Sequence, residues 1–311
     1  MSREKMIKIA MVVLVVVLLS AVIITSTGML GNSGIGGYAN AEKYTSGDTE
    51  ITDGIKNLDI NWTSGRVNIA YHSGNTVILQ ESAKRALSDD EKMQWWVDGD
   101  TLRVQFNKPG IRLNMPEKEL TVTLPAGTEL EQAGIHTTSG TIDIPEMKAK
   151  VMILDATSGD IRVTAETRNA EVNATSGDQT VRLTGEADTV RLNSTSGSIS
   201  AEAEKAAIIE VASTSGSIGI TAEESRETKA NSTSGNIHVS LGKMEKLSIG
   251  ATSGSVTAKL PQNPGFTAKV DTTSGDFSYG IALTREGDRY VCGDGSGQAV
   301  ISTTSGNVRL D

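Results

Sequence analysis

The tripeptide Thr-Ser-Gly recurs along this 311-residue chain at a nearly constant interval, and this repeat restricts the possible folds more than any other feature. Between Gly140 and Gly275 successive triplet glycines lie 18 to 21 residues apart. A sustained period of about 19 residues indicates an array in which each unit stacks on its neighbours. The glycines predicted to form the turns are Gly65, Gly140, Gly159, Gly177, Gly197, Gly216, Gly235, Gly254, Gly275 and Gly306.

Apolar and polar residues alternate on both sides of each triplet. Ile209 and Val211 precede Gly216, and Ile218 and Ile220 follow it, with mostly polar residues between them. Alternation with a period of two is typical of half-buried strands. A unit of two such strands cannot bury its apolar face alone, so equivalent units must stack in parallel. The sequence therefore predicts an all-β fold, a right-handed parallel β-helix or β-solenoid with two-strand coils of about 19 residues that bend at the triplet.

Two places interrupt this period. Residues 131–311 form the regular repeats, whereas 55–130 combine template-like coils, such as 58–71, with an insertion that we interpret as a cap. The insertion contains Trp95, Trp96 and Phe106, which form an interaction surface if they are exposed. Its "DGD" at 98–100 predicts a hairpin. The second interruption, at 284–298, predicts a protruding hairpin or loop near the distal end.

The N-terminus predicts a membrane anchor. Residues 1–8 are a basic tail, 9–30 are uncharged and long enough to cross a bilayer as a helix, and 31–54 form a Gly/Ser-rich stalk. Basic residues before the span favour a cytoplasmic N-terminus and an extracytoplasmic C-terminal domain in the cell membrane. Cleavage as a signal peptide near Ala41 is the alternative, although that site lies far beyond the apolar run.

The repeat contains no recognisable catalytic constellation. His72, His136 and His238 lie in different coils, which favours solvated surface histidines, and no cofactor motif occurs. The net charge of -9 argues against nucleic acid as a partner, and the single Cys292 excludes an internal disulfide. Oxygen ligands beside the triplets could hold Ca²⁺, although Asp and Asn also suit turns. These calcium candidates are Asp155, Asp160, Asp178, Asp271 and Asp276.

Several motifs resemble those of a bacterial β-strand-repeat family of unknown function known as "putative adhesin". They are the recurring "TSG" units, the "LTVTLPAG" strand and turn at 120–127, and the closing "GSGQAVISTTSGNVRL", and the likeness covers residues 55–311. The resemblance implies a parallel β-helix at the cell envelope, and some anchored relatives are encoded with envelope-stress systems. It supplies no catalytic residues to carry over.

These observations leave three hypotheses about function. The first is a non-enzymatic, membrane-anchored β-solenoid that binds an envelope protein or polysaccharide, in adhesion or envelope-stress sensing. The second is a polysaccharide-active β-helix enzyme, for which the outward positions offer no evident paired carboxylates. The third is a scaffold that associates end to end, because the chain stops at Asp311 directly after a strand with no obvious cap.

Overall fold

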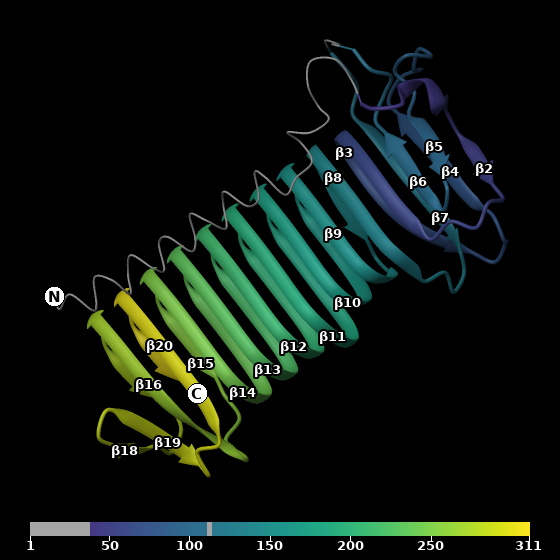
Figure 1. The fold of residues 1–311 in the computed structure, drawn as a ribbon. Helices are drawn as coiled ribbons and strands as arrows, with labels where there is room; N and C mark the ends of the chain where they lie inside the picture. Colours follow the sequence, from purple (N-terminus) through teal and green to yellow (C-terminus); the bar gives the residue numbers. More distant parts are fainter. Residues whose placement is uncertain (1–37, 111–113) are drawn as a thin grey trace. The chain divides into compact units, whose positions relative to one another are not determined.

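The computed structural model describes residues 38–110 and 114–311. They belong to two compact units that divide between Gly177 and Asp178, here called the N-terminal and the C-terminal unit (Figure 1). The described residues contain twenty-one strands and one short 3-10 helix, Ala41–Lys43, so the all-β class is confirmed. The predicted tail 1–8, anchor 9–30 and first part of the stalk lie outside the described residues. Within the described ranges, no helix is long and apolar enough to span a membrane.

The C-terminal unit begins with coils that follow the repeat. Ile199 pairs with Ile218, and Ile218 with Ile237, so equivalent repeat positions lie beside each other in parallel register. A single bent strand runs from each triplet to the next. It contains both apolar runs, which the sequence predicted to form two separate short strands. The bent strands are β11 (Gln179–Ser196), β12 (Ile199–Ser215), β13 (Ile218–Ser234) and β14 (Ile237–Ser253).

The last coil in the sequence is not the last coil in space. Strand β20 (Gly297–Ser305) pairs in parallel with β14 on one side and with β16 (Gly265–Ser274) on the other. Likewise β21 (Val308–Leu310) lies between β15 (Val256–Lys259) and β17 (Phe277–Tyr279). The expectation that the strand before Asp311 ends the stack is therefore wrong. Small and aliphatic side chains explain the inner place, because Ala299, Ile301, Val308 and Leu310 are all buried.

The terminal coil of this unit is the one formed by β16 and β17. The hairpin predicted within 284–298 is confirmed as β18 (Thr284–Glu286) and β19 (Arg289–Gly293). Strand β19 also pairs antiparallel with Gly265–Ala268 of β16, so it covers part of the outer edge of the terminal coil. The hairpin thus covers the first part of this edge, beside the start of β16 (Figure 1).

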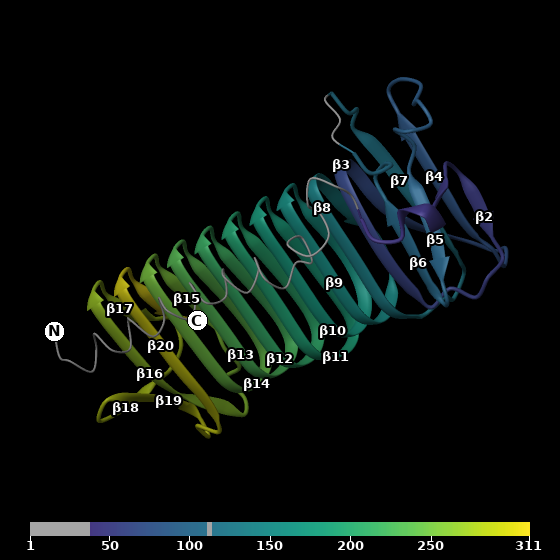
Figure 2. The same ribbon diagram turned by 45° about the horizontal axis from the view of Figure 1, so that its top comes forward.

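The N-terminal unit shows the same change of order at one of its ends. Strand β3 (Asn57–His72) lies between β8 (Leu130–Ile144) on one side and both β6 (Thr101–Gln105) and β7 (Lys118–Pro125) on the other. The coils continue through β9 (Lys148–Ser158) and β10 (Ile161–Ser176), which pair in parallel. Figure 2 shows these bent strands stacked side by side within the unit.

Antiparallel strands cover the outer coil of the N-terminal unit. Strand β4 (Val77–Ala83) pairs with β7 and with β2 (Thr49–Ile51), and β5 (Gln94–Asp98) pairs with β6 and with β1 (Thr45–Ser46). The β5–β6 pair confirms the hairpin predicted at 98–100. Residues 38–54, predicted to be stalk, instead belong to this cap, because β1 pairs with β5 and β2 pairs with β4.

Candidate interaction surfaces

The triplet glycines occupy the bend between consecutive strands. Gly216 has a φ of 145°, and a Cβ placed on it would lie 2.1 Å from the carbonyl oxygen of Gly197 in the neighbouring coil. No side chain fits there, because the backbones of successive coils touch at this point. Nine of the ten predicted turn glycines have a positive φ, and Gly140 is the exception. Gly65 and Gly140 lie within the continuous strands β3 and β8, whereas the other eight lie between strands.

The residue after the triplet completes the hydrogen bonding of the bend. Asp178 Oδ1 accepts a hydrogen bond from the backbone N–H of Ser198 at 2.8 Å, and Asn236 accepts one from Ser255 at 2.9 Å. Each bond joins one coil to the next and satisfies a backbone donor that the bend leaves free. The Asp/Asn column therefore has a structural role at these coils.

The other calcium candidates have separate surroundings. Asp160 forms an ion pair with Arg162 at 2.6 Å, and the terminal-coil residue Asp276 uses its backbone N–H to reach Asn307. Asp271 is exposed on β16. Nowhere in residues 38–110 or 114–311 do three His, Cys, Asp or Glu side chains come together in a group that could hold a metal ion.

Asp155 is buried and pairs with a histidine. His136 Nδ1 lies 2.8 Å from Asp155 Oδ2, and Asn173 donates to Asp155 Oδ1 at 2.8 Å. Burial works to lower the pKa of His136, but the hydrogen bond and charge of Asp155, helped by the charge of Asp59, raise it above the ordinary value. The expectation of a solvated surface histidine is wrong at His136, because adjacent coils bring its partners into register.

Ion pairs cross the outer surface from coil to coil. Arg191 contacts Glu210 at 3.0 Å, Lys229 contacts the same Glu210 at 2.9 Å, and Lys246 contacts Glu227 at 3.3 Å. The partners are 19 residues apart because one coil separates them. Each exposed pair contributes little stability alone, about 0–1 kcal/mol. These charges neutralise each other along the strands instead of converging on one point.

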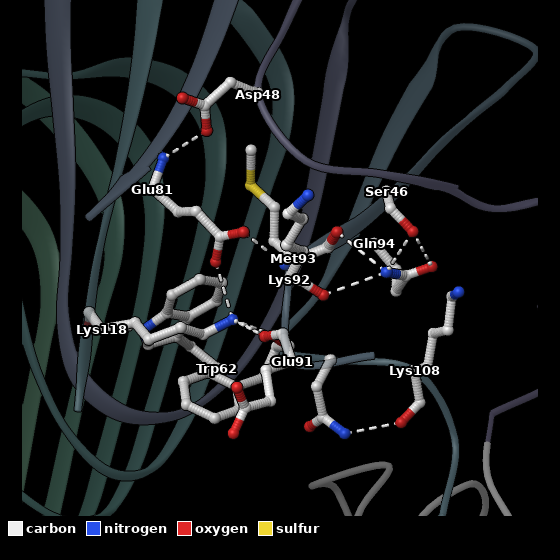
Figure 3. A network of polar contacts seen from close by, with 12 residues as sticks. Ser46, Asp48, Trp62, Glu81, Glu91, Lys92, Met93, Gln94, Lys108 and Lys118 are labelled. Carbon is white, nitrogen blue, oxygen red and sulfur yellow. Dashed lines mark hydrogen bonds and ion pairs between the residues drawn. The ribbon is translucent and has the colours of Figure 1, made fainter. Parts of the chain in front are cut away.

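The cap of the N-terminal unit contains a buried ion pair that the sequence did not predict (Figure 3). Lys118 Nζ donates to Glu81 Oε2 at 2.7 Å, and the two side chains are 0% and 5% exposed. The same ammonium donates to the carbonyl oxygens of Glu91 and Phe106 and lies 4.3 Å from the Phe106 ring centre and 5.0 Å from that of Trp62. Burial lowers the pKa of Lys118, although Glu81 opposes this shift.

The alternation of residues along β7 indicates that the Lys118 side chain points inward. Leu120, Val122 and Leu124 point inward from β7, and the same alternation two places earlier reaches Lys118. Phe106 is only 3% exposed and packs edge-on against Trp62, so its predicted place on an interaction surface is wrong. The Phe106 ring fills the interior beside Trp62.

Trp95 and Trp96 lie on β5 and are both half-buried. The Trp96 ring contacts Tyr44 edge-on at 5.7 Å between ring centres, and Lys43 Nζ lies 4.6 Å from the ring. These contacts come from residues that the sequence analysis placed in the stalk. The Trp96 side chain therefore helps to attach the N-terminal segment to the cap, and Trp95 pairs with Thr45 of β1 through the backbone.

A model of the Toastrack DUF4097 family matches residues 55–311, which is most of the chain. The chain belongs to this family. The assignment confirms the resemblance inferred from the triplet motifs. Among curated proteins, none matches this sequence.

Several solved structures are similar to this chain at low sequence identity. A "putative adhesin" from Parabacteroides distasonis is 12% identical, with 86% of this chain and 97% of that chain covered and a TM-score of 0.52. A "putative lipid binding protein" from the same species is 15% identical, with coverage of 86% and 97% and a TM-score of 0.48. A "putative adhesin" from Bacteroides fragilis is 14% identical, with coverage of 87% and 98% and a TM-score of 0.41. At 12% identity, the likeness to the Parabacteroides distasonis adhesin is one of fold alone.

In this Toastrack chain a shallow groove crosses four coils of the C-terminal unit. Its volume is about 440 Å³. The groove lies beside the triplets, where the outward residues Ser198, Ser200, Ser217 and Gly219 are small. Exposed hydroxyl groups line its centre, and His238 is the one imidazole at its rim. The lining holds a single carboxylate, that of Asp178, which already bonds to the adjacent coil.

Proposed function

We propose that this chain is a non-enzymatic, membrane-anchored β-solenoid that binds an envelope protein or polysaccharide outside the cytoplasmic membrane. Residues 9–30 form the anchor, and the repeat domain carries out an adhesin-like or envelope-stress role. The 440 Å³ groove is the observation that carries the proposal. It offers hydroxyl groups for hydrogen bonding over several coils, but its lining lacks the paired carboxylates that glycoside hydrolysis uses.

The surroundings of the groove support binding rather than chemistry. The outward charges that follow the groove residues on β11 and β12 are already paired, because Arg182 contacts Glu202 at 3.3 Å, and Asp178 bonds to Ser198. Acid–base catalysis needs a proton donor or acceptor with a suitable pKa and free access to substrate. A polar surface whose charges are already paired suits an extended partner that forms many weak hydrogen bonds.

Binding can be tested with the full-length chain purified in mild detergent. We expect isolated cell-wall material or solubilised envelope proteins to retain the wild type. Ser200→Arg fills the groove and should abolish retention. The matched control is Gln298→Arg, which places the same side chain on an exposed position of β20, away from the groove. Absence of retention of the wild type at low salt refutes the proposed function.

The enzymatic alternative is tested with the same preparation. We expect a panel of envelope polysaccharides to keep its length distribution after prolonged incubation, as followed by size-exclusion chromatography. Appearance of shortened or unsaturated products that depend on His238 or Asp178 would instead establish an enzyme.

A further inference from the structure

The terminal coil of the C-terminal unit lacks a neighbour along most of its outer edge. In inner coils the glycine of the triplet and the residue two places later donate backbone hydrogen bonds to the next coil. Gly216 N–H bonds to Ser234 O at 3.0 Å, and Ile218 N–H bonds to Asn236 O at 2.9 Å. The equivalent residues of the terminal coil are Gly275 and Phe277. Among the described residues, Gly275 N–H has no backbone acceptor, and β17 pairs only with β21.

The hairpin covers only the first part of this edge. Strand β19 pairs with Gly265–Ala268, and within residues 38–110 and 114–311 no strand pairs with the outer side of Lys269–Ser274. Unpaired edges of this length favour the addition of another strand. Within the described part of the chain, β19 is the only strand that pairs with this edge.

The core-facing row of the terminal coil is also incompletely covered. In the adjacent inner coil, Val308 and Leu310 occupy this row and are 0% exposed. Their register partners Phe277 and Tyr279 are half-buried and 51% exposed. Tyr290 of the hairpin packs on Phe277 at 4.7 Å between ring centres, but Tyr279 stays accessible. An open edge and an exposed core-row aromatic side chain therefore occur on the same coil.

We propose that this edge, Lys269–Ser274 with Phe277–Tyr279, is a homodimer interface at which a second copy of the chain pairs antiparallel through the same edge. A twofold axis through the bend places β16 of one copy against β17 of the other. Such an interface is isologous, because both copies contribute the same residues. It restores to each terminal coil the neighbour that the inner coils possess.

The side chains select the register of this pairing. Core-facing residues must oppose core-facing residues, because a shift by one residue turns every side chain to the wrong face. An axis between Ser274 and Gly275 meets this condition, since it opposes Val270 to Tyr279 and Thr272 to Phe277 of the second copy. A shift of the axis by one residue toward the N-terminus also meets it, but would oppose Asp271 to Asp276. Like charges directly opposite each other are destabilising, so the first register is favoured.

This register opposes Asp271 of one copy to Ser278 of the other, and the contact occurs twice. Ser278 is exposed and lies on the outward side of β17, so its substitution leaves the core unchanged. The interface can thus be strengthened or weakened at one position by the choice of charge. A peptide from another protein, if it were the natural occupant, would not give two symmetric contacts of this kind.

Sedimentation velocity of the full-length chain over a wide concentration range tests the proposal. We expect a concentration-dependent dimer. Tyr279→Lys should weaken it by about tenfold or more, because a charge replaces an apolar contact on both sides of the axis. The matched control is Val300→Lys, since Val300 is 50% exposed but lies on the outer face of β20. Circular dichroism melting of each variant shows whether its fold is retained.

Substitution of Ser278 tests the register itself. Ser278→Lys should tighten the dimer by several-fold and Ser278→Asp should weaken it by several-fold, since each change acts at two symmetric contacts with Asp271. Three results would overturn the proposal: a wild type that sediments as a monomer at every concentration, equal effects of the two Ser278 variants, or equal effects of Tyr279→Lys and Val300→Lys. None of these results bears on whether the groove binds an envelope partner.

Discussion

The buried pair of Lys118 and Glu81 allows a quantitative test of how the N-terminal cap is held in place. Glu81 lies on β4 and Lys118 begins β7, so the pair joins the two strands through their side chains (Figure 3). Lys118→Met keeps most of the side-chain volume at this position but removes the ammonium group. The carboxylate of Glu81, 5% exposed, then keeps only the hydrogen bond from the Met93 N–H at 2.7 Å.

The expected cost is large for three reasons. Removal of one partner of a buried ion pair typically destabilises a protein by about 3–5 kcal/mol, because an unpaired charge is left in the interior. The carbonyl groups of Glu91 and Phe106 also lose their donor. Finally, the cation no longer contacts the faces of Trp62 and Phe106. Against a total domain stability of about 5–15 kcal/mol, this loss should be plainly visible.

The double variant Lys118→Met/Glu81→Gln should recover much of the loss. Neutral Gln can still accept the hydrogen bond from Met93, and no charge remains buried. The residual cost should then be about 1–2 kcal/mol, which corresponds to the missing hydrogen bonds. The control Lys92→Met removes an exposed pair with Asp89 and should cost less than about 1 kcal/mol.

Tryptophan fluorescence during urea unfolding is the appropriate assay. All three tryptophans, at positions 62, 95 and 96, lie in the N-terminal unit, so the signal reports on that unit alone. We expect a lower urea midpoint for Lys118→Met and partial restoration for the double variant. If Lys118→Met unfolds like the wild type, or if the double variant is less stable than the single one, the argument from an uncompensated buried charge is refuted.

Two further predictions concern the bend and the histidine pair. Gly216→Val should lower the stability of the C-terminal unit by at least about 2–3 kcal/mol in thermal unfolding, because the new side chain combines an unfavourable φ with a contact of 2.1 Å. The control Thr214→Ser should have little effect. A larger loss for Thr214→Ser than for Gly216→Val would contradict the assignment of the bend. His136 has a raised folded pKa, so its stabilisation is fully present below the unfolded value of about 6.5 and is lost as pH rises through the raised pKa. Thermal midpoints measured from about pH 6 to about pH 8.5 should show this fall in the wild type and not in Asp155→Asn, and identical slopes would refute the pairing.

Each unit places a coil out of chain order at one of its ends. Strand β3 lies inside β6 and β7, and β20 lies inside β16. In each case the outermost coil carries the antiparallel strands that cover it. Such an arrangement keeps the chain segment with the most regular apolar pattern in the inner position, where both of its edges are paired.

The sequence predicted the repeating part well because the decisive information is local. The alternation around Gly216 assigns each residue to the core or to solvent without knowledge of its neighbours. The sequence left the exposure of Phe106 open and did not predict the burial of Lys118, because the burial of both depends on what packs against them from β3 and β4. A charged side chain at an inward position is a signal, but it becomes a prediction only when its partner is known.

The sequence by itself determined the all-β class, the period, the bend at each triplet and the register of one coil on the next. These follow from the alternation of side chains and from the one residue type that fits the bend. Only the tertiary structure decided which coil is outermost, how Lys118 and Glu81 meet, and why the edge of β16 and β17 stays open. Every coil carries nearly the same pattern and can pair with any other. The order of the coils at the ends therefore depends on which strand edges pair across long sequence separations and on the loops that join the strands. A local sequence pattern contains neither kind of information.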